Sequence, residues 1–330
     1  MRAAVIRAFN QDLSIETVSD PTCPDNGVVL QVEACGVCRS DFHGWTGEHP
    51  KVKPGDILGH EYCGTVVAAG RDARHKLGDR LIAPFILSCG TCPACHTGVS
   101  NTCAQQIVPG FGTQGAYAEL VAVPFDHNLV PLPASMTPAL AAGLGCRVTT
   151  AWHALTDRAN VRAGEWVAVH GTGGIGLATL LLAKMLGAQV VVVDVVEDKL
   201  THARSLGADA AVNALTDNVA QAIHDITGGG AHVSVEALGI AATTNASIDC
   251  LRVLGRHVQV GMPAGETGMM QVNMRGIYSK QLSFFGTRGM PAWKYPTLLD
   301  MIARGQVYSR PMVARQASPS APSAQPAAHH

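Results

Sequence analysis

Four cysteines lie within fifteen residues of this 330-residue chain: Cys89, Cys92, Cys95 and Cys103. The spacing C-x2-C-x2-C-x7-C lets a short loop fold four thiolates around one tetrahedral ion, with glycine and proline turns between them. Zinc is the expected ion, because the sequence lacks the C-x3-C-P ending of a bacterial iron–sulfur run. Four protein ligands leave no open coordination position. The lobe 89–103 is therefore predicted to hold a structural zinc that performs no chemistry.

Three other stretches offer ligands of mixed type: C-G-V-C-R-S-D-F-H (35–43), G-H-E (59–61) and L-G-C-R (144–147). A catalytic zinc takes three protein ligands and keeps a fourth position for water or substrate. Each stretch alone is weak evidence, because an isolated Cys or His is most often packed in a core. Cys35 and Cys38 also form a C-x2-C pair, which alone could indicate a dithiol redox site.

A glycine-rich turn, G-T-G-G-I-G, begins at Gly171. A bare G-x-G-x-x-G is weak evidence in a chain with 35 glycines. Here a strand-like run precedes the turn, an apolar stretch of helix length follows it, and a second strand-like run (189–194) comes next. The pattern predicts a βαβ unit in which Gly171, Gly173 and Gly176 let the backbone approach a pyrophosphate at the helix N-terminus.

Asp194 ends that second run, 18 residues after Gly176. A carboxylate at this place accepts hydrogen bonds from the adenosine ribose hydroxyls, and it would repel a 2′-phosphate. The sequence therefore favours NAD as cofactor over NADP.

The overall composition indicates an ordinary globular protein of about two domains, with 47% hydrophobic residues and a net charge of -1. The balance of 24 basic and 25 acidic residues disfavours nucleic acid and membrane surfaces as partners. No membrane-spanning stretch and no secretory signal is apparent, so we expect a cytoplasmic protein. Clustered cysteines in that reducing compartment are expected to bind metal rather than form disulfides.

The elements that must position these residues fall into two patterns. After the glycine turn, apolar runs at 231–238, 255–261 and 282–287 alternate with helical stretches, which predicts a doubly wound parallel sheet. The N-terminal third has short strand-like runs, such as 28–35 and 64–70, separated by turns and with little helical periodicity. It is expected to be a β-rich, partly barrel-like domain.

In their order and intervals, these stretches resemble the zinc-dependent alcohol dehydrogenases of the medium-chain dehydrogenase/reductase family, over about residues 1–315. The resemblance implies an α/β protein: a GroES-like catalytic domain (1–146), a Rossmann NAD-binding domain (147–286) and a return segment (287–316). It implies reversible oxidation of a primary or secondary alcohol to an aldehyde or ketone by hydride transfer to NAD. Two zinc ions per chain are expected, one catalytic and one structural.

The resemblance also assigns roles around the catalytic zinc. Cys38, His60 and Cys146 match the family's zinc ligands, and Glu61 matches an acidic group near the metal. Asp41 matches the carboxylate that accepts the free ring N–H of His60 and so fixes its tautomer.

Further roles follow from the same resemblance. Ser40 and His43 match the family's proton relay. Gly174 and Ile175 belong to the cofactor-binding turn, and Lys199 matches a lysine near the adenosine ribose.

Alternatives remain within and beyond this activity. A polyol dehydrogenase of the same family would use nearly the same ligands, and a non-catalytic zinc- or nucleotide-binding relative would keep the fold without turnover. Trp45, Phe85 and Phe111 could line a substrate pocket or simply pack in the core. The run 282–287 lies where relatives pair their sheets, which implies a homodimer or homotetramer, although it could equally be a buried last strand.

The end of the chain departs from the family pattern. Residues 317–330 are rich in Pro, Ser and Ala and have no apolar periodicity, so they are expected to form a disordered tail in place of the family's closing strand.

Overall fold

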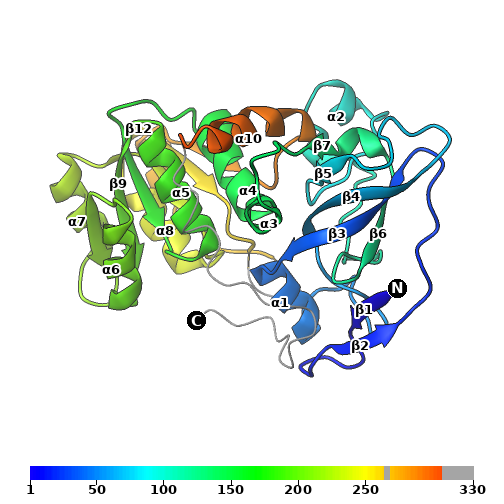
Figure 1. Cartoon of the computed structure of the whole chain (residues 1–330). Helices are drawn as coiled ribbons and strands as arrows, with labels where there is room; N and C mark the ends of the chain where they lie inside the picture. The colour runs from blue at the N-terminus through cyan, green and yellow to red at the C-terminus, as the bar shows by residue number, and fades with distance from the viewer. Residues whose placement is uncertain (264–267, 307–330) are drawn as a thin grey trace. The chain divides into compact units, whose positions relative to one another are not determined.

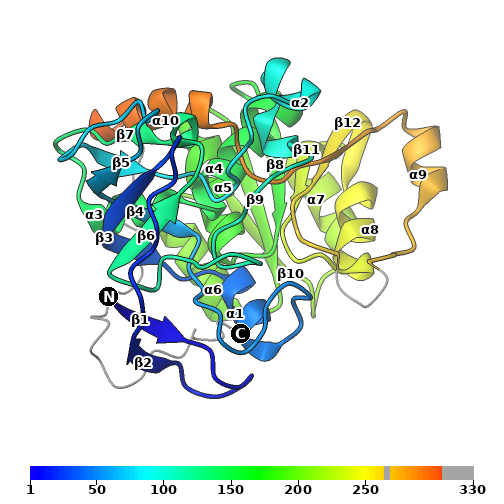
Figure 2. The same cartoon turned by 90° about the vertical axis from the view of Figure 1, so that its right-hand side faces the viewer.

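The computed structural model describes residues 1–263 and 268–306, which form two compact units (Figures 1 and 2). The first unit comprises Met1–Thr149 and the segment from Gly289 onward, and the second comprises Thr150–Arg288. The tail expected at 317–330 and the last part of the expected return segment lie outside the described residues.

The first unit is built on antiparallel β-structure. Strands β6-β3-β4-β5-β7 form one sheet in this order, and β1 pairs with β2 beside it. The bounds are β1 Arg2–Val5, β2 Ser14–Thr17, β3 Val28–Gly36, β4 Glu61–Ala69, β5 Arg80–Ile82, β6 Leu120–Val123 and β7 Val130–Pro131. Fully buried Leu30, Tyr62 and Leu81 come from three adjacent strands of the sheet and pack in one apolar cluster.

Short helices occupy the connections of this unit, although its sequence shows little helical periodicity. They are α1 Arg39–Thr46, α2 Pro93–His96, η1 Ser100–Thr102, η2 Asp126–Asn128, α3 Pro138–Leu144, η4 Ala292–Lys294 and α10 Tyr295–Ala303. Helices of one or two turns are too short for the 3.6-residue pattern to repeat, which explains why sequence analysis did not predict α1 or α3. α4 (Arg147–His153) and the π-helical turn η3 (Ala154–Arg158) continue the chain into the second unit.

The second unit contains a six-stranded parallel sheet in the order β10-β9-β8-β11-β12-β13. The bounds are β8 Trp166–His170, β9 Gln189–Asp194, β10 Ala210–Asn213, β11 Ala231–Glu236, β12 Leu251–Gln259 and β13 Ser283–Gly286. The predicted doubly wound sheet is confirmed. The order reverses between β8 and β11, which is the switch point where such sheets bind ligands at their carboxyl ends.

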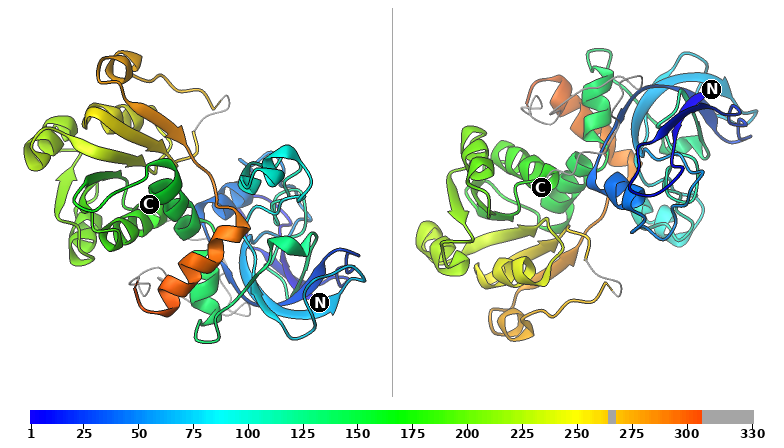
Figure 3. Two further views of the ribbon diagram at one scale, coloured as in Figure 1. Left: turned by 90° about the horizontal axis from the view of Figure 1, so that it is seen from above. Right: turned by 90° about the horizontal axis from the view of Figure 1, so that it is seen from below.

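Helices cover both faces of this sheet (Figure 3). They are α5 Gly174–Met185, α6 Glu197–Ser205, α7 Val219–Thr227 and α8 Ala241–Asp249, and the short helix α9 (Met274–Ser279) contacts α8. Right-handed crossovers place α5 and α6 on one face, because β8, β9 and β10 advance in one direction. The opposite direction of β11 and β12 places α7 and α8, which contact each other, on the other face.

The last strand, β13, lies at an edge of the sheet and pairs with β12. Its side chains are mostly exposed, and Phe284 keeps 44% of its surface accessible. β13 is therefore an exposed edge strand rather than the buried last strand that was the alternative for residues 282–287.

Among the described residues, no helix combines the length and the apolar character that crossing a bilayer requires.

Candidate functional site

The four clustered cysteines converge on one point in the first unit. Their sulfur atoms are 3.5 Å apart for Cys89 and Cys103, 3.5 Å for Cys92 and Cys95, 3.8 Å for Cys92 and Cys103, and 4.0 Å for Cys89 and Cys95. Zinc–sulfur bonds of about 2.3 Å in a tetrahedron give sulfur separations of about 3.8 Å. The spacing fits one tetrahedral ion, whereas a disulfide would need about 2 Å.

The loop also supplies donors to these sulfurs. The Thr91 backbone N–H and hydroxyl both lie 3.5 Å from Cys89 Sγ, and these bonds lower the pKa of Cys89 to about 6. Cys103 is buried, and burial raises the pKa of its thiol to about 11. A bound dication would hold all four in the thiolate form, because a coordinating thiol is deprotonated outright.

The second ligand group consists of Cys38, His60, Glu61 and Cys146, whose ligand atoms all lie within 4.8 Å of one another. The four come from three places in the first unit: the start of α1, the start of β4 and the turn between α3 and α4. Antiparallel pairing of β3 with β4 sets Gly36 opposite Glu61, which brings the first two places together.

Local structure fixes Cys38. It is the N-cap of α1, where its Sγ accepts the N–H of Ser40 at 3.3 Å. Asp41 completes a capping box by accepting the N–H of Cys38 at 3.0 Å. The sequence C-R-S-D thus folds so that the thiol and the carboxylate both lie at the N-terminus of the helix.

His60 is held between its two neighbours. Its Nδ1 lies 3.2 Å from Asp41 Oδ1, and its Nε2 lies 3.0 Å from Cys38 Sγ. Asp41 also accepts the N–H of Gly59 at 3.2 Å, and both His60 and Asp41 are buried. A ring whose Nδ1–H is donated to a carboxylate presents Nε2 as the metal ligand.

The electrostatics of this group favour a cation. The Cys146 thiol donates to Cys38 and, against the opposing effect of burial, lowers the pKa of Cys38, and His60 lowers it further. Burial opposes protonation of His60, but Asp41 and the Cys38 thiolate outweigh it and raise the pKa of His60. Burial, followed by the negative charge of Cys38, raises the pKa of Glu61 to about 7. The raised pKa values of His60 and Glu61 reflect negative charge gathered at a buried site.

Glu61 gives a direct test of whether a metal fits. Its Oε1 accepts the N–H of Cys146 at 3.0 Å, whereas its buried Oε2 has no hydrogen-bond partner among the described residues. The guanidinium of Arg147 lies 3.7 Å from Oε2 and was not singled out by sequence analysis. Two thiols, an imidazole nitrogen and a carboxylate oxygen that accepts no hydrogen bond within the described chain are a donor set that fits zinc with an open position.

The two residues predicted for the relay both lie on α1, three positions apart and therefore on one face. Ser40 and His43 are half-buried. The Nδ1 of His43 contacts the carboxylate of Glu48, just beyond the C-terminal end of the helix. Sequence analysis missed Glu48, because no spacing rule connects a helix residue to the loop that follows.

Of the three aromatic candidates, two surround the imidazole of His60. The ring centroids of Phe111 and Phe85 lie 5.2 Å and 6.0 Å from that of His60, both edge-on, and both side chains are buried. Trp45 instead donates its indole N–H to the carbonyl of Gln11 at 2.6 Å.

In the second unit, the glycine turn connects β8 to α5. A Cβ on Gly176 would lie 1.8 Å from the carbonyl oxygen of Gly171, and Gly171 itself has φ of +94°, so both positions require glycine. A Cβ on Gly173 would meet nothing within 4 Å. Helix α5 begins at Gly174, so the backbone N–H groups of Gly174, Ile175 and Gly176 are free of helical partners. An open space in front of a helix N-terminus fits a pyrophosphate.

Asp194 lies at the end of β9 and is tied to the glycine turn. Its Oδ2 accepts the N–H of Thr172 at 2.8 Å and the Thr172 hydroxyl at 2.6 Å, and its Oδ1 accepts the N–H of Val195 at 2.8 Å. Burial opposes ionisation, but these bonds together lower the pKa of Asp194. Lys199 lies half-buried on α6. Thr172 was inside the recognised motif, but its hydroxyl has a role only once β8 and β9 are paired.

Two protein families match this chain. The alcohol dehydrogenase GroES-like domain matches residues 24–134, and the zinc-binding dehydrogenase family matches residues 174–304. The first range lies in the β-rich unit, and the second covers most of the parallel sheet together with α10.

Whole-chain relatives agree. An alcohol dehydrogenase from Geobacillus stearothermophilus is 35% identical over 318 residues, covering 95% of this chain and 91% of that protein. Among solved structures, an alcohol dehydrogenase from Thermus sp. ATN1 has a TM-score of 0.86 at 32% identity, covering 93% of this chain and 90% of the other. A putative zinc-binding dehydrogenase from Sinorhizobium meliloti 1021, bound to NADP, has a TM-score of 0.83 at 30% identity and covers 93% and 89%. The chain belongs to the zinc-dependent alcohol dehydrogenases of the medium-chain dehydrogenase/reductase family.

Proposed function

We propose that this protein is an NAD-dependent alcohol dehydrogenase that interconverts a primary or secondary alcohol and its aldehyde or ketone. The observation that carries the proposal is the convergence of Cys38, His60 and Cys146 beside Oε2 of Glu61, which accepts no hydrogen bond from the described residues. Three ligands of this type leave a coordination position for substrate, which a closed structural site does not have.

Zinc held by Cys38, His60 and Cys146 would supply a Lewis acid that makes a hydroxyl acidic or polarises a carbonyl. The chain's own residues prepare that site. Asp41 holds the Nδ1–H of His60, which leaves Nε2 aimed at the ligand group. Glu61 places a second carboxylate oxygen where it can stabilise a cation during ligand exchange. Phe85 and Phe111 keep the imidazole in an apolar, dry surrounding.

We propose that a proton leaves the substrate hydroxyl through Ser40 and then His43. Both side chains lie on the same face of α1 as partly accessible groups, which supports a path toward solvent. His43 contacts Glu48, and this carboxylate holds the orientation of the imidazole ring.

NAD is the proposed cofactor, with the nicotinamide ring as hydride acceptor. The N–H groups at the start of α5 would bind the pyrophosphate, and Asp194 would accept hydrogen bonds from the hydroxyls of the adenosine ribose. The carboxylate of Asp194 supports NAD over NADP because a 2′-phosphate would meet its charge. The NADP-bound relative shows that the fold also accepts the phosphorylated cofactor, so the preference must be measured.

The decisive experiment measures zinc content per chain together with NADH absorbance on adding primary, secondary, aromatic and polyol substrates. We expect two zinc ions per chain and NADH formation with simple alcohols. Cys38→Ser should abolish turnover and lower the zinc content to one, while NADH binding persists. Cys23→Ser, at a half-buried cysteine outside both clusters, is the matched control and should keep both zincs.

Three outcomes would change this reading. Full turnover by Cys38→Ser would refute the assignment of the ligand. One zinc per chain and no NADH formation would indicate a non-catalytic relative. A clear preference for polyols would identify the enzyme as a polyol dehydrogenase.

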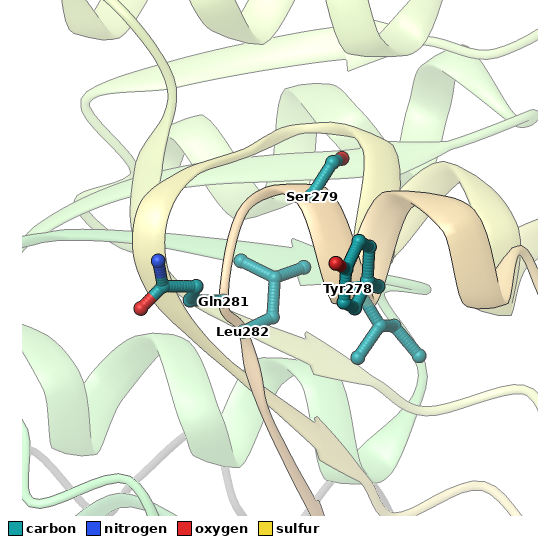
Figure 4. A pocket seen from close by; sticks show the side chains of 5 residues that line it. Tyr278, Ser279, Gln281 and Leu282 are labelled. Carbon is teal, nitrogen blue, oxygen red and sulfur yellow. The ribbon is translucent and has the colours of Figure 1, made fainter.

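We also propose that two or four copies of this chain associate through the β13 edge. Among the described residues β13 pairs on one side only, with β12. Phe284 on β13 is 44% exposed, with its ring centroid 4.5 Å from that of His257, and Leu254 on β12 is 67% exposed. Near them, Ile277, Tyr278, Ser279, Gln281 and Leu282 line a pocket of about 550 Å³ (Figure 4). An open edge with apolar neighbours favours pairing with a second strand. Light scattering should give at least twice the monomer mass.

The cytoplasm is the proposed location. All ten cysteines of the chain have free thiols in the structure; six of them belong to the two ligand groups, and two others, Cys63 and Cys250, are buried. Free thiols persist in a reducing compartment.

A further inference from the structure

A buried carboxylate, Glu236, lies at the switch point of the parallel sheet. It is the last residue of β11, and in register it lies opposite His170 of β8 on one side and Gln259 of β12 on the other. Its side chain is fully buried. The carboxyl ends of β8 and β11 are where a doubly wound sheet binds its ligand, so this charge lies directly behind the predicted dinucleotide site.

The charge of Glu236 is balanced by hydrogen-bond donors rather than by a cation within the described part of the chain. Its Oε1 accepts the N–H of Leu238 at 2.9 Å, the N–H of Gly239 at 3.0 Å and the hydroxyl of Thr243 at 2.6 Å. Its Oε2 accepts the Gly239 N–H at 2.9 Å and the Gln259 side-chain amide at 2.5 Å. A buried carboxylate is costly unless several donors satisfy it, and here the donors come mainly from one loop.

That loop, residues 237–240, reaches the glycine turn. A Cβ placed on Gly171 would lie 2.8 Å from Cγ of Leu238, so the Leu238 side chain rests on the first glycine of the turn. Gly239 has φ of +79° and packs against the carbonyl of Met262, in the segment after β12. Leu238 and Ile240 remain 50% and 44% exposed. Glu236 therefore holds two apolar side chains on the surface next to the place where the pyrophosphate is expected.

The orientation of Gln259 is fixed from its other side. Its Oε1 lies 3.3 Å from Nε2 of His257 and accepts the Thr244 hydroxyl at 3.1 Å. Its side-chain NH₂ is thereby turned toward Glu236 and also donates to the carbonyl of Gly261 at 3.0 Å. The Gln259 amide is the donor and the Glu236 carboxylate is the acceptor of this hydrogen bond. A substitution that changes only one of the two side chains therefore breaks the match.

We propose that Glu236 is a positioning residue for the dinucleotide: it holds the loop 237–240 against the glycine turn so that Leu238 and Ile240 bound the cofactor site. The inference rests on the proposed function, because it assumes that a dinucleotide binds at this turn. A carboxylate with five acceptor contacts fixes the loop before the cofactor arrives, which lowers the entropic cost of binding.

The test is NADH affinity, measured by the fluorescence of NADH on titration with the zinc-loaded protein. In Glu236→Gln the new NH₂ group would face either the N–H of Gly239 or the side-chain NH₂ of Gln259. Both groups are donors, so a hydrogen bond would be lost and two donors would be placed against each other. We expect the Kd for NADH to rise at least tenfold, while the zinc content stays at that of the parent protein. The double variant Glu236→Gln with Gln259→Glu restores one donor and one acceptor across the pair and should recover most of the affinity.

Two further variants keep the test decisive. Gln259→Glu alone places two carboxylates face to face and should weaken NADH binding as strongly as Glu236→Gln. If Glu236→Gln does not fold, Thr243→Val on α8 removes a single donor to Glu236 and should raise the Kd about threefold.

The outcomes separate this inference from the proposed function. Parent protein that binds zinc but no NADH would overturn the proposed function and this inference together. Parent protein that binds NADH, with Glu236→Gln or Thr243→Val unchanged in Kd, would overturn the positioning role alone. Weakened binding that the double exchange does not restore would likewise show that Glu236 supports only the fold.

Discussion

Asp41 and His60 form a buried pair in which the carboxylate lies 3.2 Å from Nδ1 of the imidazole. The same carboxylate accepts the backbone N–H of Cys38 and of Gly59. One side chain thus caps α1, orients the imidazole and fixes the backbone on both sides of the proposed metal site.

Replacing Asp41 by Asn should weaken zinc binding at the Cys38, His60 and Cys146 site. The amide can still accept one backbone N–H, but it does not supply the charge that strengthens the imidazole as a ligand. Loss of such a supporting carboxylate typically lowers metal affinity by about 10- to 100-fold. Competition with a chromophoric chelator measures the change, and the four-cysteine site of the same chain is the internal control. Equal affinity at both sites in the variant and the parent would contradict the role of Asp41.

Asp194→Asn should change cofactor preference. The amide keeps the shape of the side chain and part of its bonding to Thr172, but it removes the charge that a 2′-phosphate would meet. We expect the ratio of kcat/KM for NAD to that for NADP to fall at least about tenfold, equivalent to roughly 1.4 kcal/mol. Steady-state kinetics with both cofactors measures it, and Glu197→Gln, an exposed acidic residue on α6, is the matched control. A parent protein that prefers NADP would refute the assignment directly.

The fluorescence of Trp293 should report zinc binding by the four-cysteine lobe 89–103. Its indole N–H donates to the carbonyl of Gly98 at 2.8 Å, which connects the segment before α10 to the lobe. Cys95→Ser removes one thiolate, and we expect a loss on the order of 10 °C in Tm together with a change in tryptophan emission. In Trp293→Phe the zinc content should be unchanged and the response of the emission to chelation should be reduced. A chelator response that persists in full in Trp293→Phe would place the reporter at another tryptophan.

Acid should destabilise the second unit through two buried histidines. Burial lowers the pKa of His170 to about 3 and that of His257 to about 4, so both stay neutral in the fold. The unfolded chain takes up these protons near pH 6.5, so the stabilising contribution is complete above that pH. It is lost as the pH falls from about 6.5 toward 4, by about 1.4 kcal/mol per pH unit for each histidine.

Urea unfolding between pH 7 and pH 4 measures this loss. In His170→Leu the free energy of unfolding should depend less steeply on pH, with a slope that corresponds to the uptake of about one proton fewer, because only His257 of the two histidines remains. An unchanged slope in the variant would show that His170 is protonated equally in the folded and unfolded chain.

The local elements around the chemistry could be predicted from the sequence for a physical reason. The four cysteines of the lobe lie within fifteen residues, so turn geometry alone can gather them. The glycine turn lies between two apolar runs, and strand, tight turn and helix follow from steric and apolar periodicity that short segments already contain. β12 nevertheless begins at Leu251, four residues before the predicted run, because alternation near a strand end is weak.

Only the tertiary structure decided which distant groups meet. Cys38, His60 and Cys146 are separated by up to 108 positions, and family resemblance rather than their own spacing suggested that they share an ion. Pairing of β3 with β4 and the turn before α4 bring their ligand atoms together. Arg147 beside Glu61, Glu48 beside His43, Thr172 on Asp194 and the donors around Glu236 had no signal in sequence. Such contacts depend on how separate elements pack, whereas propensity and periodicity act only between neighbours along the chain.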